Sequence, residues 1–349
     1  MLATLVYPIA RMTQPQPSVH SKPRHLLIGA GTQGWQLIEY QEISASASEY
    51  LGASNVSRVA FSATRPMLRE FGETLREVRP SHYYFDPRSG SQRPLKSVWE
   101  AVVIGFHLER YGVEPICVIT DFAYRRWRLQ SAIVSARSGV VTSLMSPSVI
   151  GKLFPHKRII GPMPFPLSVA TLRALQQRKK RSEERWRTLR DRVVFIGMLH
   201  EPRKSVIEAI KSGLAQREIL MEVFGRAPDG SRMSEDDYWG ILLNARLVVS
   251  TSSQMGENGT DFSDRNHFIY RFIETTAAGT ALAIGPVEGS EHLLEPDSDY
   301  IAFSSAEEAV EKISSAWHER GALEKISRRG ASRSKDLIES HRYWTLVFE

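Results

Sequence analysis

Cysteine is almost absent from the sequence, since Cys117 is its single thiol. One cysteine excludes an internal disulfide framework and a metal site built from several thiolates. Long apolar runs are absent too, and the apolar segment at residues 1–9 is too short to span a bilayer. We therefore expect a cytoplasmic protein without a transmembrane helix.

Acidic residues are absent before Glu39, and prolines are frequent in residues 14–23. This composition predicts that residues 1–23 are a disordered lead. An organelle transit peptide, and a start at Met12 rather than Met1, remain open alternatives.

Apolar residues make up 42% of the 349 positions, which is enough to bury a large core, and the usual length of a domain favours two domains. The 45 lysines and arginines exceed the 39 aspartates and glutamates and leave a net charge of +6. This excess favours anionic partners such as phosphates, nucleic acid or an acidic membrane surface, without choosing among them.

Short β-branched runs alternate with amphipathic helical runs, which is typical of an α/β fold with a parallel sheet between helices. Each half of the chain has enough of these runs for its own sheet. Helices are predicted at residues 67–79 and 97–111. The predicted strands are residues 25–29, 58–62, 115–120, 140–144, 192–197, 220–224, 246–250 and 281–284.

The domain boundary is predicted where three prolines between Gly161 and Pro166 discourage regular structure, just before a basic helical stretch at residues 171–192. Two interpretations of this stretch remain open, because it could dock on anionic lipid at the inner face of a membrane or form a solvated helix face. No nucleic-acid motif accompanies it, so we expect no nucleic-acid partner. The predicted parts are an N-terminal domain (residues 24–166), a basic linker helix (167–192) and a C-terminal domain (193–349).

A glycine-rich segment, Gly29-Ala-Gly31-Thr-Gln-Gly34, follows the first predicted strand and opens a helix. Such glycines let the backbone approach a pyrophosphate, so the segment suggests a dinucleotide site. The acidic residue that takes the ribose is missing from the end of the second strand, and Arg65 is the one side chain there for a 2′-phosphate. The alternative is a tight turn whose three glycines form a loop lining a cleft.

The segment at residues 261–303 is predicted to form helix, strand, helix, strand. Arg271 and Glu274 are three residues apart and so share one helix face. A carboxylate at the edge of a parallel sheet can accept two ribose hydroxyls, and an arginine beside it can meet a diphosphate. An Arg-Glu pair within the helix is the alternative.

The pattern Arg271-x-x-Glu274-x-x-Ala277-x-Gly279, with the strand and acidic helix after it, resembles the C-terminal signature of group 1 glycosyltransferases, most closely their CgeB-like branch. The resemblance extends back to Gly197 and the basic pair Arg203-Lys204, and it covers residues 155–349. The helix and strand expected between Tyr238 and Ser250 fit the same pattern.

This resemblance implies the GT-B fold, in which two Rossmann-like domains face each other across a cleft and the C-terminal one holds a nucleotide-sugar. Glu274 would take the ribose hydroxyls, while Arg203 and Lys204 would stabilise the diphosphate without a metal or other cofactor. Gly197 would form the turn beside them, and the last helix would pack back on the N-terminal domain. The acidic run at residues 235–237 is more simply first-turn helix charge than a metal site.

One position departs from the family pattern. Many retaining members carry a second glutamate eight residues before the ribose glutamate, and this chain has Asn266 there. An asparagine can hydrogen-bond a sugar hydroxyl but supplies no charge, so the stereochemical outcome is not readable from the sequence.

The N-terminal half is expected to hold a hydroxyl acceptor, which the resemblance associates with cell-surface polysaccharide or glycolipid synthesis. Asp121 ends a predicted strand at the edge where ligands gather and is the candidate general base. Helix N-capping is its alternative role. Among the histidines, His107 is predicted to be a packed residue, while His200 and His267 lie beside the donor motifs.

Three functions from different classes remain. The first is glycosyl transfer from a nucleotide-sugar. The second is a protein that binds a nucleotide-sugar without catalysis, suggested by Asn266. The third is a nicotinamide-dependent oxidoreductase built on the glycine-rich segment at residues 29–34.

Overall fold

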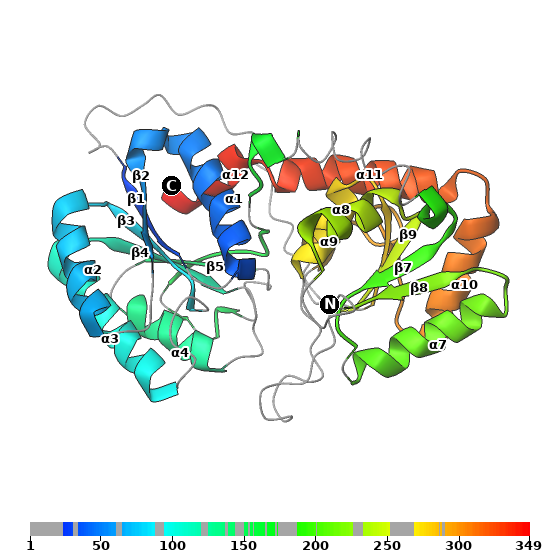
Figure 1. The fold of residues 1–349 in the computed structure, drawn as a ribbon, viewed down its shortest axis with the longest axis horizontal. Helices are drawn as coiled ribbons and strands as arrows, with labels where there is room; N and C mark the ends of the chain where they lie inside the picture. The colour runs from blue at the N-terminus through cyan, green and yellow to red at the C-terminus, as the bar shows by residue number, and fades with distance from the viewer. Residues whose placement is uncertain are drawn as a thin grey trace, which may run out of the picture.

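The computed structural model describes residues 24–349, with the exception of 31–33, 61–64, 88–93, 120–124, 137–138, 144–149, 153, 156, 165, 172, 174–186, 200, 226–232, 252–268, 286 and 288–289. The described residues form two α/β lobes, each built on its own parallel sheet (Figure 1).

The first sheet is parallel and has the strand order β2-β1-β3-β4-β5-β6. Strand β1, next to the edge strand β2, pairs Leu26 with Val56 on one side and with His82 on the other. The strands are β1 (Leu26–Ala30), β2 (Val56–Ala60), β3 (His82–Phe85), β4 (Glu114–Ile119), β5 (Val140–Ser143) and β6 (Arg158–Ile160). The helices between them are α1 (Gly34–Leu51), α2 (Arg65–Val78), α3 (Pro94–Tyr111) and α4 (Arg125–Val134).

Helices cover both faces of this sheet. Phe71 of α2, Ile104 of α3 and Val134 of α4 share a buried cluster on one face. The other face is covered by α1 and by the last helix of the chain, α12 (Ser340–Phe348), which lies beside α1 in Figure 1. Trp344 of α12 is fully buried and donates from its indole N–H to the Ser46 hydroxyl at 3.2 Å. The C-terminal helix is therefore part of the core of the first lobe.

The second sheet is also parallel, with the strand order β11-β10-β9-β7-β8. Its strands are β7 (Val193–Ile196), β8 (Met221–Phe224), β9 (Leu247–Ser250), β10 (Ala281–Ile284) and β11 (Ile301–Ala302). Its helices are α7 (Arg203–Ala215), α8 (Glu235–Asn244), α9 (Tyr270–Ala277), α10 (Ala306–His318) and α11 (Ala322–Leu337).

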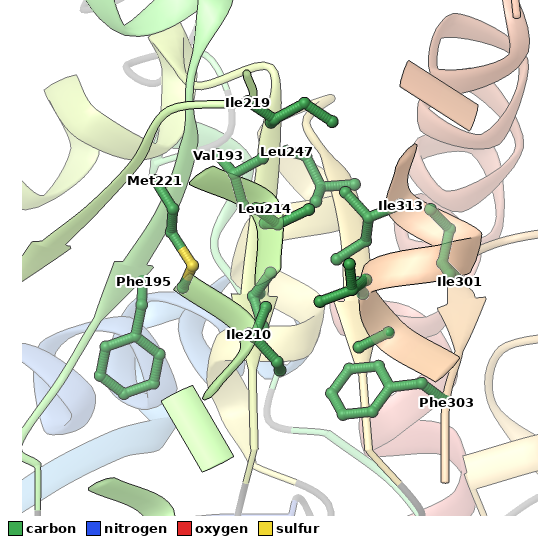
Figure 2. Close-up of a cluster of buried hydrophobic side chains, with 14 of the residues drawn as sticks. Val193, Phe195, Ile210, Leu214, Ile219, Met221, Leu247, Ile301, Phe303 and Ile313 are labelled. Carbon is green, nitrogen blue, oxygen red and sulfur yellow. The ribbon is translucent and has the colours of Figure 1, made fainter. Parts of the chain in front are cut away.

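The core of the second lobe lies on both faces of this sheet. On one face, apolar side chains of α7 and α10 pack on the strands, as Figure 2 shows for Ile210, Leu214 and Ile313. On the other face, α8 and α9 pack on the same strands through Leu242 and Phe272. Because all four residues of β7, β9 and β10 are buried, these strands have the continuous apolar sequences expected of a doubly covered parallel sheet.

The predicted strands all exist, with ends that differ by at most two residues where the ends are described, and β10 has the predicted bounds. Two strands were missed, β3 and β6. The second helix expected within residues 261–303, at residues 288–295, is wrong, because the described part forms a short 3-10 turn at Ser290–His292. The basic stretch also departs from a continuous α-helix at its end, where Arg187–Asp191 are 3-10 and the chain then enters β7.

His107 packs between helices, as the sequence predicts. Its ring centroid lies 6.2 Å from that of Phe71, and a Cβ atom on Gly72 would come within 2.7 Å of its Cε1. Burial lowers the pKa of His107.

None of the described helices is long and apolar enough to cross a membrane.

Candidate functional site

The candidate site lies at the carboxyl end of β7 in the second lobe. The next strand along the chain, β8, lies on one side of β7, and β9 lies on the other. A reversal of strand order of this kind is where parallel α/β sheets bind ligands, just beyond the carboxyl ends of the strands. Gly197 follows β7 at this point, and α7 begins shortly after it.

Position 197 requires a glycine, because of its backbone conformation and because of the side chains close to it. Its φ angle is 153°, a value that residues with a side chain rarely adopt. A Cβ atom here would lie 3.0 Å from Nη1 of Arg271 and 3.2 Å from Cζ of Phe195. The backbone N–H donates to the Phe224 carbonyl at 2.8 Å, which ties the turn to β8. The glycine thus lets the arginine approach the end of β7.

Arg271 connects α9 to that strand end. Its Nη1 donates to the Ile196 carbonyl, and its Nε donates to the Tyr238 hydroxyl at 3.3 Å. The guanidinium carbon also lies 5.5 Å from the centre of the Tyr238 ring. Burial opposes the charge of Arg271, but Tyr238 and Glu274 outweigh it and raise the pKa of the guanidinium. A charged Arg271 therefore holds three elements together.

Glu274 is fixed by the same tyrosine. The Tyr238 hydroxyl donates to Oε2 of Glu274 while it accepts from Arg271. Burial and the nearby Glu274 carboxylate raise the pKa of Tyr238, so the phenol stays protonated and acts as a donor. The spacing of Arg271 and Glu274 predicts one shared face, and the structure adds that a residue of α8 joins them.

α8 presents Tyr238 because the start of this helix is fixed by a cap. Ser234 accepts from the Asp237 backbone N–H at 3.1 Å, and Glu235, Asp236 and Asp237 form the acidic first turn. This agrees with the prediction that the acidic run is helix-start charge. Tyr238 follows one position later.

α9 is held from behind by α11. The Thr276 hydroxyl hydrogen-bonds the Ser334 hydroxyl, and Gly330 lets the helices approach, because a Cβ there would lie 2.6 Å from the Asp299 carbonyl oxygen and 3.0 Å from Cγ2 of Thr276. Arg271 and Glu274 are therefore carried by a helix with little room to shift.

We expect Gly330→Ala to lower the stability of the protein by about 1–3 kcal/mol, because the added methyl group overpacks against backbone that cannot move independently. Alanine has a higher helix propensity than glycine, which by itself would raise the stability. A loss of stability therefore reports the packing and not the helix propensity. Thermal unfolding measures the effect. Ser332→Ala, an exposed position on the same helix, is the control. A Gly330→Ala variant as stable as the wild type would contradict the packing argument.

Arg203 and Lys204, the two predicted diphosphate ligands, have different surroundings. Arg203 is the first residue of α7, is buried, and donates from Nη1 to the Met198 carbonyl at 3.2 Å. Lys204 is exposed and lies 3.8 Å from the Glu208 carboxylate one turn along. Both stand at the N-terminal end of α7, where the helix dipole favours an anion. Their contact with a diphosphate stays a prediction.

Several predicted residues lie outside the described residues: Asp121, Asn266, Gly31, His200 and His267. The glycine-rich segment needs one correction. Gly29 is not in a loop but inside β1, where it pairs with Val59, and Gly34 is the first residue of α1. Among the residues that the structure describes, no group of three or more metal-ligating side chains gathers.

Tyr238 is the site residue that sequence reasoning missed. It served only to align the chain with a family pattern, and nothing in its neighbourhood marks it as a partner of Glu274. The contact spans 36 positions of sequence. An approximate placement of α8 against α9 would have been needed to find it.

Solved structures with a similar fold define the class. HepE of Anabaena, solved in complex with UDP and glucose, has a TM-score of 0.65 at 11% identity, with 92% of this chain and 98% of that chain covered. A glycosyltransferase from Rickettsia africae has a TM-score of 0.61 at 7% identity, covering 93% and 97%. Sucrose-phosphate synthase from Thermosynechococcus elongatus has a TM-score of 0.58 at 12% identity, covering 93% and 96%.

At these identities the likeness shows the fold, which is GT-B, and it confirms the predicted pair of α/β domains. Residues 203–345 match the family model described as glycosyl transferase-like. The chain therefore carries a glycosyltransferase-type domain on a GT-B fold, and the class of enzyme predicted from the sequence is confirmed. The matched segment begins at Arg203 and includes Tyr238, Arg271 and Glu274. Among curated proteins, none matches this chain.

Proposed function

We propose that the protein transfers a sugar from a nucleoside-diphosphate sugar to a hydroxyl acceptor, as a member of the CgeB-like branch. The observation that carries this is Glu274, a carboxylate fixed by Tyr238 at the carboxyl end of the second sheet. A carboxylate oriented in this way accepts both hydroxyls of a ribose. That is the part of the donor shared by all nucleotide-sugars.

Charge development at the diphosphate is the step that the second lobe would stabilise. As the bond to the sugar breaks, negative charge grows on the leaving diphosphate. Arg203 and Lys204 lie at the start of α7, and together with the N-terminal end of that helix they would stabilise this charge. This assignment needs no metal ion or cofactor.

The first lobe would bind the acceptor. Asp121, in the segment after β4, is the proposed general base that takes the proton of the acceptor hydroxyl. Asn266 would hydrogen-bond the transferred sugar. The acceptor would be a polysaccharide or glycolipid at the inner face of a membrane, with the basic stretch of residues 171–192 as a contact to anionic lipid.

A thermal-shift panel of UDP, GDP, ADP, NADH and NADPH tests the donor site. A ligand that binds the native state at a hundredfold excess over its Kd stabilises it by about 2.7 kcal/mol, which raises Tm by several degrees. We expect one nucleoside diphosphate to raise the Tm of the wild type but not that of Glu274→Ala. It should also raise the Tm of the control Glu324→Ala, an exposed change on α11.

Three other outcomes decide against the proposal. Stabilisation by NADPH alone would indicate the oxidoreductase built on residues 29–34. Stabilisation by a nucleoside diphosphate that persists in Glu274→Ala would remove the carboxylate from the donor site. Binding of the nucleotide-sugar without hydrolysis or transfer over a broad acceptor set would indicate the binding protein without catalysis.

A further inference from the structure

α3 carries a row of exposed apolar side chains on its outer surface. Leu95 is 89% exposed, Trp99 63%, Val102 44% and Phe106 59%. Their spacing of four, three and four residues places them on one face of the helix. Leu129 of the adjacent α4 is 50% exposed. We call these five residues the apolar stripe.

The inner face of α3 is already occupied. Ala101, Ile104 and Leu108 are buried in the core of the first lobe. α3 is therefore apolar on two opposite faces, whereas a helix on the surface of a lone domain has a polar outer face. Single exposed apolar residues are ordinary, but a continuous group that includes tryptophan and phenylalanine marks a surface that binds something.

α3 and α4 approach closely, so the stripe spans two helices. A Cβ atom on Gly105 would lie 3.3 Å from the Ile133 carbonyl oxygen, a separation that leaves no room for a larger residue. The other neighbour of α3 is α2, which carries the exposed acidic residues Glu70 and Glu77. The two flanks of the stripe therefore differ, and the one free of acidic residues is the α4 side.

Basic residues stand at the starts of α3 and α4 in the sequence of these helices. Arg125, Arg126 and Arg128 lie in the first turn of α4, and Lys96 lies in the first turn of α3. No aspartate or glutamate occurs in residues 122–182. Because α3 and α4 each follow a parallel strand, both helix starts lie at the carboxyl edge of the first sheet, where their dipoles add positive potential.

From this combination we propose that the apolar stripe docks on a lipid bilayer with anionic headgroups. Tryptophan, phenylalanine and leucine would enter the boundary between headgroups and acyl chains, and the cations beside the helix starts would pair with acidic headgroups. No described helix can cross a membrane, so α3 lies on the surface rather than through it. The residues of the apolar stripe do not belong to the basic stretch of residues 171–192.

Charge decides between a bilayer and a second copy of the chain. A second copy brings the same net charge of +6 to the interface, so its electrostatics oppose association, whereas anionic headgroups complement the basic first turns of α3 and α4. The docking does not depend on glycosyl transfer, since it needs neither donor nor acceptor.

Vesicle co-sedimentation of the full chain tests the proposal. We expect the wild type to pellet with vesicles of phosphatidylglycerol and phosphatidylethanolamine, and about tenfold less with phosphatidylcholine vesicles. The double variant Trp99→Ser/Phe106→Ser should bind the anionic vesicles at least about tenfold more weakly, because two aromatic side chains no longer enter the interface.

The matched control is Leu220→Ser/Leu346→Ser, which removes two exposed apolar residues from other surfaces and should bind as the wild type does. Both double variants should unfold at the wild-type temperature and keep the same nucleotide-induced rise in Tm, which separates this test from that of the donor site.

Three results would overturn the inference. The first is a wild type that stays in the supernatant with anionic vesicles. The second is a stripe variant that pellets like the wild type. The third is a control pair that loses as much binding as the stripe variant. A wild-type dimer in sedimentation that becomes a monomer in Trp99→Ser/Phe106→Ser would assign the stripe to a second copy instead.

Discussion

Glu274→Ala is expected to weaken binding of the donor nucleotide by about a hundredfold or more, with little loss of fold. Each hydrogen bond between a ribose hydroxyl and a charged carboxylate contributes about 1.5–3 kcal/mol, and Glu274 is proposed to accept two. About 2.7 kcal/mol already corresponds to a hundredfold change in Kd. Isothermal titration with the nucleoside diphosphate selected by the thermal-shift panel measures the change.

Two neighbouring variants make the prediction specific. Glu274→Gln keeps an oxygen that accepts from Tyr238 but loses the second acceptor and the charge, so it should bind almost as poorly as alanine. Tyr238→Phe keeps the charge and removes the hydroxyl that orients it, so it should weaken binding about tenfold. Equal Kd values for Glu274→Gln and the wild type would mean that the carboxylate does not bind the ribose.

The strands of the second sheet were predictable because their information is local. Val193–Ile196 and Ala281–Ile284 are unbroken apolar runs buried on both faces, and short runs of this kind have few other uses in an α/β chain. The strand His82–Phe85 was missed because it carries no β-branched residue, although its aromatic residues favour a strand, and it pairs with β1 and β4 on either side. Pairing between distant segments leaves no periodic trace in the sequence.

One part of the candidate site was predictable from the sequence and another part was not. The shared face of Arg271 and Glu274 follows from helix geometry, so their juxtaposition was predictable. Their fixed orientation was not, because it depends on Tyr238 and on the Ile196 carbonyl, which is 75 positions away from Arg271. Sequence reasoning assigned Arg271 to a diphosphate, and the structure shows that this side chain also holds α9 to the end of β7.

Gly197 provides the most direct test of that positioning role. Gly197→Ala is expected to destabilise the protein by about 2–4 kcal/mol, because alanine strains a backbone with φ of 153° and its methyl group would lie 3.0 Å from Nη1 of Arg271. The guanidinium must then leave the Ile196 carbonyl, and the orientation of Tyr238 and Glu274 is lost with it. We expect a lower Tm and no stabilisation by the donor nucleotide.

Gly225→Ala is the matched control for this change. Gly225 follows β8 in the same region and lacks the positive φ angle of Gly197, and among the described residues a Cβ there would meet nothing closer than the Gly197 carbonyl oxygen at 3.9 Å. In an Arg271→Ala background, Gly197→Ala should cost less than in the wild type, since the close contact with Nη1 of Arg271 is gone and the backbone strain and the contact with Phe195 remain. Equal costs in the two backgrounds would show that the glycine serves the turn alone, and that the close approach of Arg271 does not depend on it.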